Sequence, residues 1–559
     1  MRTGITARRA AATSSLAAAL VLGLASPITA VAQPEPLGSD SVTETQAGAA
    51  FRVVEGWIVG WSVPVETPEA ARLEVPAAQV TLRLAGGRVG SGLASGPGSI
   101  RLATREAQLS AERSALGGND ALAAGNRLQM ARRLDVFLEL AQPPVPVGEL
   151  ALLMPRLGAS PGVQGLAARL GNQWRYAMPA DVEDDTASSL AAVLLGSADA
   201  VADSPAQLAE RDGVTFYTFR TVHLTRDRDG ALIALHRGER YVEPGEITEQ
   251  RLRDGATSIA DYLARQLTND DIDSLDASLV RYALVRAHNA RLMPIGRDAL
   301  TLPDRDGVAR DPVADAVMDA VVAPYLREGL LEAEGLPDGT AARALFDATA
   351  EFAWTGRVRE AIGLWAMAEV LQDDADRERL RDDLRSLIAA AGADNAVALM
   401  PWIDMAEREL YVDGERPSAV LFRQVREQLW RFQVQADDVS RDDRDFVGGI
   451  VFTRGGAQLP GDTTARAVTF AAAALRDPEL TTADERSAEI RRLLAACRFV
   501  LQLVVEPVDS YQFAEGRSAV GGVRATPADA VIRPAGSALT LLMLIETLDS
   551  LRAVANAAD

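Results

Sequence analysis

The second half of the chain shows one helical pattern after another, and this feature most constrains the fold. From about residue 250 onward, about eleven segments carry apolar residues three and four positions apart, which is the spacing of one helix face. Examples are "SAVLFRQVREQLWRFQ" and "AGSALTLLMLIETLDSLRAVA". Short paired helices of this kind build either an open solenoid or a closed α/α toroid. A solenoid repeats with a fixed period of about 34–45 residues. No such period is visible, so the pattern favours a toroid.

The first half of the chain differs, because strand-like patterns alternate with helical ones. "AAQVTLRLAGGRVGSGL" alternates apolar with small or polar residues, and Gly86-Gly87 marks a hairpin turn. "RLDVFLELAQPPVPV" alternates similarly and stops at a proline pair. We therefore expect a multidomain chain in which an α+β region precedes an all-α toroid. The expected boundaries are a signal peptide over 1–32, a linker over 33–50, an α+β domain over 51–250 and an α/α-toroid domain over 251–559.

The N-terminus has the pattern of a secretory signal. Arg8 and Arg9 precede an apolar run over residues 16–24, and Ala30-Val31-Ala32 precedes Gln33 as an A-x-A cleavage site. This pattern predicts export, so the mature protein is expected to be secreted or periplasmic. Retention of the segment as an anchor stays open, as does the choice between the general and the twin-arginine export routes. No later stretch reaches the ~18 apolar residues of a membrane helix, so no integral membrane segment is expected after cleavage.

Charge and cysteine content exclude some functions. The formal net charge of −21 argues against nucleic-acid binding, because phosphate contacts need a basic patch. Cys497 is the only cysteine, so no intramolecular disulfide can form. It lies in the apolar run "RRLLAACRFVLQL", which predicts a buried packing residue and not a nucleophile.

Motifs for metals and cofactors are missing from the sequence. His223 and His236 lie on separate predicted strands without carboxylates at ligand spacing, so we interpret them as hydrogen-bonded strand residues. His288 lies on a predicted helix. The chain contains no H-E-x-x-H, Walker or G-x-S-x-G motif. "GGRVGSG" is not followed by a helix in the order that a dinucleotide loop needs, so we interpret it as a hairpin. The sequence therefore predicts neither a cofactor nor a metal site.

Two segments of the helical half resemble the α/α-toroid modules of uncharacterised secreted bacterial proteins. These modules share a superfamily with six-hairpin glycosidases, polysaccharide lyases and terpenoid cyclases. The resemblance lies in "LPGDTTARAVTFAAAAL" over 459–475 and "SAVGGVRATPADAVIRPAGSAL" over 518–539. The matching frame in the second segment consists of Gly521, Gly522, Arg524, Ile532, Arg533 and Ser537-Ala538-Leu539.

The chain departs from the toroid pattern at its polar positions. Where the family has Asp-Tyr-x-Gln-His, this chain has Pro534, Ala535 and Gly536. Where the family has Arg-Ala-Glu-Gly, this chain reads Arg466, then Ala-Val-Thr. The resemblance thus implies a toroid pocket that lacks the usual groups for proton transfer.

The N-terminal half resembles the AMMECR domain family, a small α+β fold. The segments "VTLRLAGGRVGSG", "LDVFLELAQPPVPV" and "PGVQGLAARLGNQWRYAMPADV" occur in the order that this family gives. Its short Leu-Arg-Gly-Cys-Ile-Gly signature is replaced by "GRVGSGL", which has no cysteine. This resemblance implies a fold and no particular activity.

The candidate site follows from the glycine turn at 521–522. Arginines beside such a turn can present forked donors to a carboxylate or a phosphate, although they can equally pair with acidic helix ends. The candidate ligand-binding residues are Arg524, Arg533, Arg466, Trp430 and Tyr511. Asp445 and Asp462 are the candidates for acid or base if the protein is catalytic. The acidic segment 436–446 is expected to be a solvated loop, with calcium binding as the alternative.

Two hypotheses of function remain open at this stage. The first is a non-catalytic secreted or envelope protein that binds a glycan, another anionic ligand or a protein partner through the rim of the toroid. The second is a glycoside hydrolase or polysaccharide lyase of the toroid type. Two carboxylates facing each other across a groove would favour the second hypothesis. A rim with arginines or apolar residues alone would favour the first.

Overall fold

The computed structural model of the chain describes eleven stretches of the sequence. The described residues are 41–115, 124–227, 229–267, 274–294, 311–327, 337–349, 352, 354–411, 416–452, 459–513 and 516–558. The predicted signal peptide and residues 33–40 of the predicted linker lie outside them. Residues 40–559 form one compact unit.

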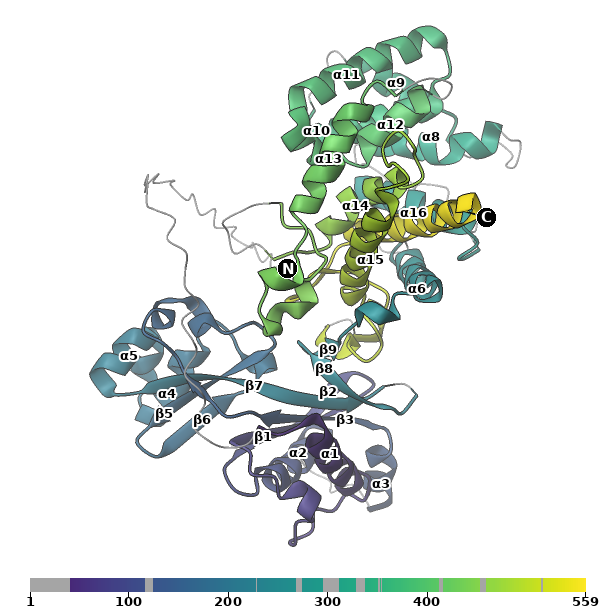
Figure 1. Cartoon of the computed structure of the whole chain (residues 1–559). Coiled ribbons are helices and arrows are strands. Elements are labelled where there is room, and N and C mark those ends of the chain that lie inside the picture. Colours follow the sequence, from purple (N-terminus) through teal and green to yellow (C-terminus); the bar gives the residue numbers. More distant parts are fainter. Residues whose placement is uncertain are drawn as a thin grey trace, which may run out of the picture. The chain divides into compact units, whose positions relative to one another are not determined.

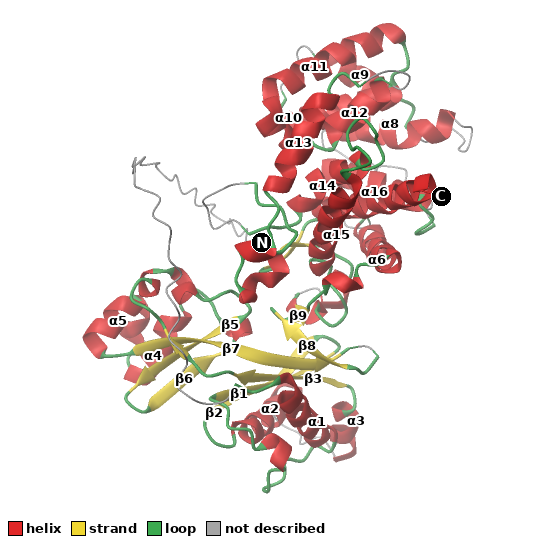
Figure 2. Ribbon diagram, in the orientation of Figure 1, coloured by secondary structure: helices red, strands yellow, loops and turns green. Residues whose placement is uncertain are grey.

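The N-terminal region is an antiparallel sheet with helices packed on it (Figures 1 and 2). The strand order is β2-β1-β3-β7-β5-β6, and the long β7 also pairs with β4 and β8. The strands are β1 (Ala77–Leu84), β2 (Gly87–Ser95), β3 (Leu134–Ala141), β4 (Val145–Pro146), β5 (Gln164–Leu170), β6 (Gln173–Ala177), β7 (Thr215–Arg226), β8 (Leu232–His236) and β9 (Glu239–Arg240). The helices are α1 (Glu44–Val59), α2 (Ser99–Ala115), α3 (Ala124–Ala131), α4 (Thr186–Leu195) and α5 (Pro205–Asp212). Because α1 begins at Glu44, the residues predicted as the end of the linker belong to a helix.

The sequence pattern of β1 and β2 explains how this region packs. Val80 and Leu82 of β1 join Phe51 of α1 in a buried apolar core. On β2, a Cβ atom at Gly92 would lie 2.2 Å from the carbonyl oxygen of Ala103, so only glycine lets α2 approach this closely. "GGRVGSG" therefore forms a hairpin strand, as the sequence indicated, and the structure adds that α2 packs on it.

The described residues of the C-terminal region are mostly helical and include a short hairpin. Within its described residues it contains eleven α-helices, in agreement with the predicted number. They are α6 (Glu249–Gln266), α7 (Ser274–Asn289), α8 (Pro312–Arg327), α9 (Thr340–Ala348), α10 (Arg357–Val370), α11 (Asp374–Ala396), α12 (Trp402–Leu410), α13 (Ala419–Arg431), α14 (Thr463–Ala474), α15 (Arg486–Gln502) and α16 (Pro534–Ala558). The hairpin consists of β10 (Arg524–Thr526) and β11 (Asp529–Ile532). The order of an α+β region followed by a helical region is confirmed.

Contacts among the helices follow an almost complete circuit, in which Arg416 bridges the step from α12 to α14. Helix α7 packs against α8, α8 against α10, and α10 against α12, while α14 packs against α16 and α16 returns to α7. Arg416 connects α12 to the residues after α14, because its guanidinium pairs with Asp404 at 2.5 Å and with Asp477 at 2.6 Å. The rings of Tyr282, Trp365 and Trp402 pack in series, with centroids 4.7 Å and 5.2 Å apart. We call α7, α8, α10, α12, α14 and α16 the helix circuit.

The helices were also compared with the requirements of a membrane span. Within the described part of the chain, no individual helix combines the length and the apolar composition needed to cross a bilayer. Residues 374–399 and 402–410 meet those requirements only when taken together, across a bend of 114°.

Candidate functional site

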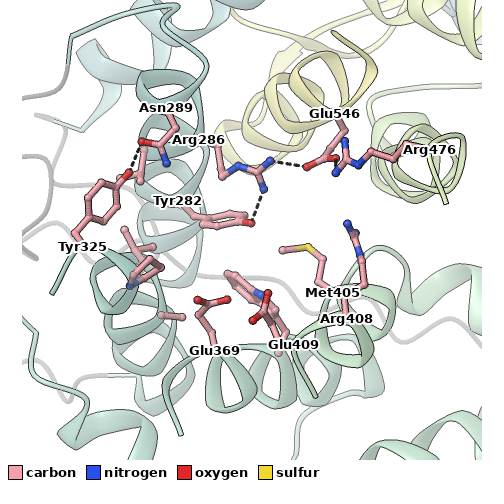
Figure 3. Close-up of a pocket in the computed structure, with 15 residues that line it drawn as sticks. Tyr282, Arg286, Asn289, Tyr325, Glu369, Met405, Arg408, Glu409, Arg476 and Glu546 are labelled. Atoms are coloured by element: carbon pink, nitrogen blue, oxygen red, sulfur yellow. Dashed lines mark hydrogen bonds and ion pairs between the residues drawn. The ribbon is translucent and has the colours of Figure 1, made fainter. Parts of the chain in front are cut away.

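The helix circuit surrounds a pocket of about 280 Å³ (Figure 3). Side chains of α7, α8, α10, α12 and α16 line it, together with one residue that follows α14. The polar and aromatic lining residues are Tyr282, Arg286, Asn289, Tyr325, Trp365, Glu369, Arg408, Glu409, Arg476 and Glu546. We call this the central pocket.

Glu546 is the anchor of one wall of the central pocket. Its Oε1 accepts a hydrogen bond from Arg286 at 2.6 Å, and its Oε2 accepts one from Arg476 at 2.6 Å. Burial alone would raise the pKa of Glu546, but Arg286, Arg476 and Arg408 together hold it below its usual value. Glu546 is therefore ionised at neutral pH and fixes two guanidinium groups in place.

Tyr282 and Asn289 lie on the same face of α7 as Arg286. Arg286 donates a hydrogen bond to the Tyr282 hydroxyl oxygen at 3.2 Å, and burial raises the pKa of Tyr282 above its usual value. Tyr325 of α8 donates its hydroxyl hydrogen to Oδ1 of the exposed Asn289 at 2.6 Å. The polar part of the pocket lining thus runs along α7 from the buried Tyr282 to the exposed Asn289.

Two more carboxylates enter the central pocket from the opposite side. Glu369 comes from α10 and Glu409 from α12, and Figure 3 shows both side chains directed into the pocket. Beside them, Arg408 donates to Asp404 at 2.5 Å. Burial would lower the pKa of Arg408, but Asp404 and Glu546 raise it above the usual value. No hydrogen bond or ion pair of the Glu409 carboxylate is found among the described residues.

The charges of this lining are balanced, since three guanidinium groups face three carboxylates. Such a surface offers both donors and acceptors, and the Tyr282, Tyr325 and Trp365 rings add apolar faces. Ligand pockets combine an apolar or aromatic lining with a few polar groups that orient the ligand. The arrangement therefore fits a compact ligand that carries many hydroxyl groups.

Metal binding finds no support in the described stretches, where no group of three or more His, Cys, Asp or Glu side chains is placed to hold an ion. His236 lies 3.3 Å from Asp445 and His223 lies 3.5 Å from Glu139, so both histidines have carboxylate partners. Cys497 is buried, and burial raises the pKa of its thiol to about 12. Its prediction as a packing residue is confirmed.

Arg524, the main candidate from the sequence, does not face solvent. Only 3% of it is exposed, and it donates hydrogen bonds to Glu239 and to the carbonyl oxygen of Pro527 at 3.0 Å. Tyr511 lies nearby and donates to the carbonyl oxygen of Gly238 at 2.8 Å. The expectation of an exposed rim arginine is wrong, because the β8–β9 turn of the sheet region covers this position and supplies the carboxylate.

Asp445 is also a buried ion-pair residue. Arg237 donates to it at 2.8 Å, and His236 lies on its other oxygen. Burial would raise the pKa of Asp445, but His236 and Arg237 hold it far below its usual value. Asp442 of the same segment is buried and pairs with Arg220 at 2.7 Å. The sequence analysis predicted a solvated loop over 436–446. That prediction is wrong for part of the segment, which forms a buried connection to the sheet region.

The remaining candidates lie in two other places. Asp462 is buried, and its carboxylate lies 3.8 Å from the guanidinium of the exposed Arg533. Asp462 also interacts with Arg466, and burial lowers the pKa of Arg466. Trp430 is buried and donates its indole hydrogen to Glu489 at 2.6 Å. The structure thus brings Asp462, Arg466 and Arg533 together, but none of the seven candidates lines the central pocket.

Sequence reasoning missed the residues of the central pocket, although two signals pointed to them. Glu546 stands within the apolar run "ALTLLMLIETL", where an isolated charge needs a buried partner. Tyr282, Arg286 and Asn289 recur at positions i, i+4 and i+7, which puts three polar groups on one face of a mostly buried helix.

Comparisons with known proteins add little. No family model and no curated protein matches the sequence. Among solved structures, the uncharacterised protein PH0010 from Pyrococcus horikoshii is similar to 34% of this chain and 95% of its own, at 19% identity and a TM-score of 0.22. A score this low carries no inference, so the resemblances to toroid and AMMECR proteins stay predictions.

Proposed function

We propose that this is a secreted or envelope-associated bacterial protein whose helical region is an α/α toroid that binds a glycan in its central pocket. The packing of α6, the first helix of this region, against α16, its last, supports the toroid, since an open solenoid would leave its first and last helices apart. The observation that carries the binding proposal is the lining of the central pocket, which combines balanced donors and acceptors with aromatic rings.

A sugar fits this lining for three physical reasons. Each hydroxyl group both donates and accepts, so it can pair with a carboxylate and a guanidinium at once. The apolar face of a sugar ring can pack on the partly exposed ring of Tyr325. The volume of about 280 Å³ is near the lower end of ligand pockets, so a single sugar unit or a chain end is the expected occupant.

A glycan array tests the proposal on the purified mature protein. We expect binding of a defined glycan, and we expect Asn289→Ala and Glu409→Gln to weaken it. Both residues line the pocket without holding its ion pairs. Glu427→Gln is the matched control, because this exposed residue of α13 lies outside the lining. Absence of any glycan binding would contradict the proposal.

Glycoside hydrolysis is the second candidate, and one observation favours it. Glu369 and Glu409 enter the same pocket from two helices that pack together, and glycosidases cleave with a pair of carboxylates. Asp445 and Asp462 are less suited to this role because both are buried beside arginines. If the protein is catalytic, the release of reducing ends should disappear in Glu369→Gln and in Glu409→Gln, while glycan binding is weakened but still measurable.

A further inference from the structure

A second hollow, of about 470 Å³, lies where the β1–β2 turn meets the residues that follow α15. Its lining consists of Arg83, Ala85, Gly86, Gly87, Arg88, Tyr511, Phe513, Gly516 and Arg517. These residues are separate from those of the central pocket, so the inference below does not depend on the proposed glycan site. We call this the arginine hollow.

The lining of the arginine hollow is cationic. It contains three guanidinium groups, and none of its described lining residues is an aspartate or a glutamate. Arg88 and Arg517 are exposed. The nearest carboxylates stand beside the hollow and not in it: Asp181 lies 3.6 Å from Arg88, and Asp135 interacts with Arg517 and Arg83. An anion in the hollow would meet forked donors, and no like charge stands among the described lining residues.

Arg83 is held in position at the base of this lining. One of its Nη atoms donates to the carbonyl oxygen of Gly86 at 3.1 Å, and the guanidinium lies 4.2 Å from the ring centre of Tyr511. Its buried Nε has no hydrogen-bond partner among the residues that the structure describes. Burial lowers the pKa of Arg83, which reflects the cost of desolvating this cation, and Tyr511, Asp181 and Asp135 offset only part of that cost. A bound anion would remove part of that cost.

Glycines let a ligand approach the backbone of the turn. Ala85 and Gly86 have φ values of 53° and 89°, as a tight two-residue hairpin turn requires. A Cβ atom at Gly86 would meet nothing within 4 Å, so the turn presents open backbone to the hollow. A water molecule takes up about 30 Å³ in the liquid, and a phosphate group has five heavy atoms. The hollow of about 470 Å³ therefore leaves room beyond a bound phosphate.

We propose that the arginine hollow binds the phosphate group of a small organic phosphate. Guanidinium groups match phosphate oxygens with two parallel hydrogen bonds, and the exposed Arg88 and Arg517 reach the hollow from two separate segments, where a phosphate would compete with Asp181 and Asp135 for them. The space beyond the phosphate accommodates the organic part. Free inorganic phosphate has the same binding chemistry, and the experiment separates the two sources.

Calorimetric titration of the full mature chain at low ionic strength tests this proposal with glycerol 3-phosphate, inorganic phosphate and glycerol. Glycerol 3-phosphate should bind and glycerol should not. Arg88→Gln and Arg517→Gln should each weaken binding about tenfold, the size expected for one hydrogen bond to a charged group. Both are exposed, so their melting temperatures should stay unchanged. Arg175→Gln on β6, exposed and outside the lining, should bind like the unmodified chain.

Each of the other possible results also supports or overturns the proposed phosphate site. Inorganic phosphate binding as tightly as glycerol 3-phosphate would overturn the organic ligand and leave free phosphate as the occupant. Absence of binding for both phosphates would overturn the site, and so would equal losses in Arg175→Gln and in the two lining variants. Arg83→Gln should abolish binding, and its circular dichroism spectrum shows whether the chain still folds.

Discussion

Arg524 donates a hydrogen bond to Glu239 from the β10–β11 hairpin, and both side chains are buried. The two residues are 285 positions apart in the chain, so this contact ties the helical region to the β8–β9 turn of the sheet region. Gln502 of α15 strengthens the same connection, since its amide accepts from the backbone of Val242 at 2.7 Å and donates to the carbonyl oxygen of Arg240 at 2.9 Å.

Arg524→Ala should therefore destabilise the fold without affecting the central pocket. Removal of one partner leaves a buried carboxylate uncompensated, which costs roughly 3–5 kcal/mol of unfolding free energy. Chemical denaturation at pH 8 measures the loss. Arg431→Ala is the control, because this arginine at the end of α13 is exposed and should cost little. Equal stability of the two variants would contradict a structural role for Arg524.

Asp445→Asn should also destabilise the fold, because it removes the carboxylate that Arg237 and His236 both contact and leaves Asp443 as the remaining carboxylate partner of Arg237. We expect a loss of roughly 1–3 kcal/mol in the free energy of unfolding. Asp437→Asn lies in the same acidic segment but is exposed, so its effect should stay within about 0.5 kcal/mol. If Asp445→Asn is as stable as Asp437→Asn, the ion pair between Asp445 and Arg237 is dispensable for the fold.

Glu139 should make stability fall as the pH rises. Burial raises its pKa from 4.5 to about 8, and nearby Asp181 adds to the shift. Because the folded chain binds this proton more tightly than the unfolded chain, the contribution is complete below pH 4.5 and is lost as the pH passes 8. Glu139→Gln should remove roughly 1–4 kcal/mol of that decline. Denaturation curves between pH 5 and 9 test this, and an unchanged slope in the variant would refute it.

The predicted export signal has a direct test. If the A-x-A pattern is cleaved, mass spectrometry of exported protein should find Gln33 as the first residue. Recovery of the protein with residues 1–32 attached would show that the segment is kept.

Local patterns made the order of the elements predictable, whereas contacts between distant residues decided the sites. The spacing of apolar residues gave the helices, and Gly86 gave the β1–β2 turn. Cys497 was predictable because its neighbours within one helix are apolar. Arg524 was not, because a glycine turn beside an arginine looks the same whether solvent or Glu239 lies opposite. The central pocket was hidden for a similar reason, since five helices and Arg476 each contribute only a few side chains to it.

The glycan site is the central claim, and titration calorimetry of paired variants tests it most directly. With the best glycan from the array, Glu409→Gln and Asn289→Ala should each weaken binding about tenfold, because each removes or weakens a hydrogen bond to the sugar. Their melting temperatures should match that of the unmodified chain, and Glu427→Gln should bind normally. Unchanged affinity in both pocket variants would contradict the account, because the glycan would then bind elsewhere.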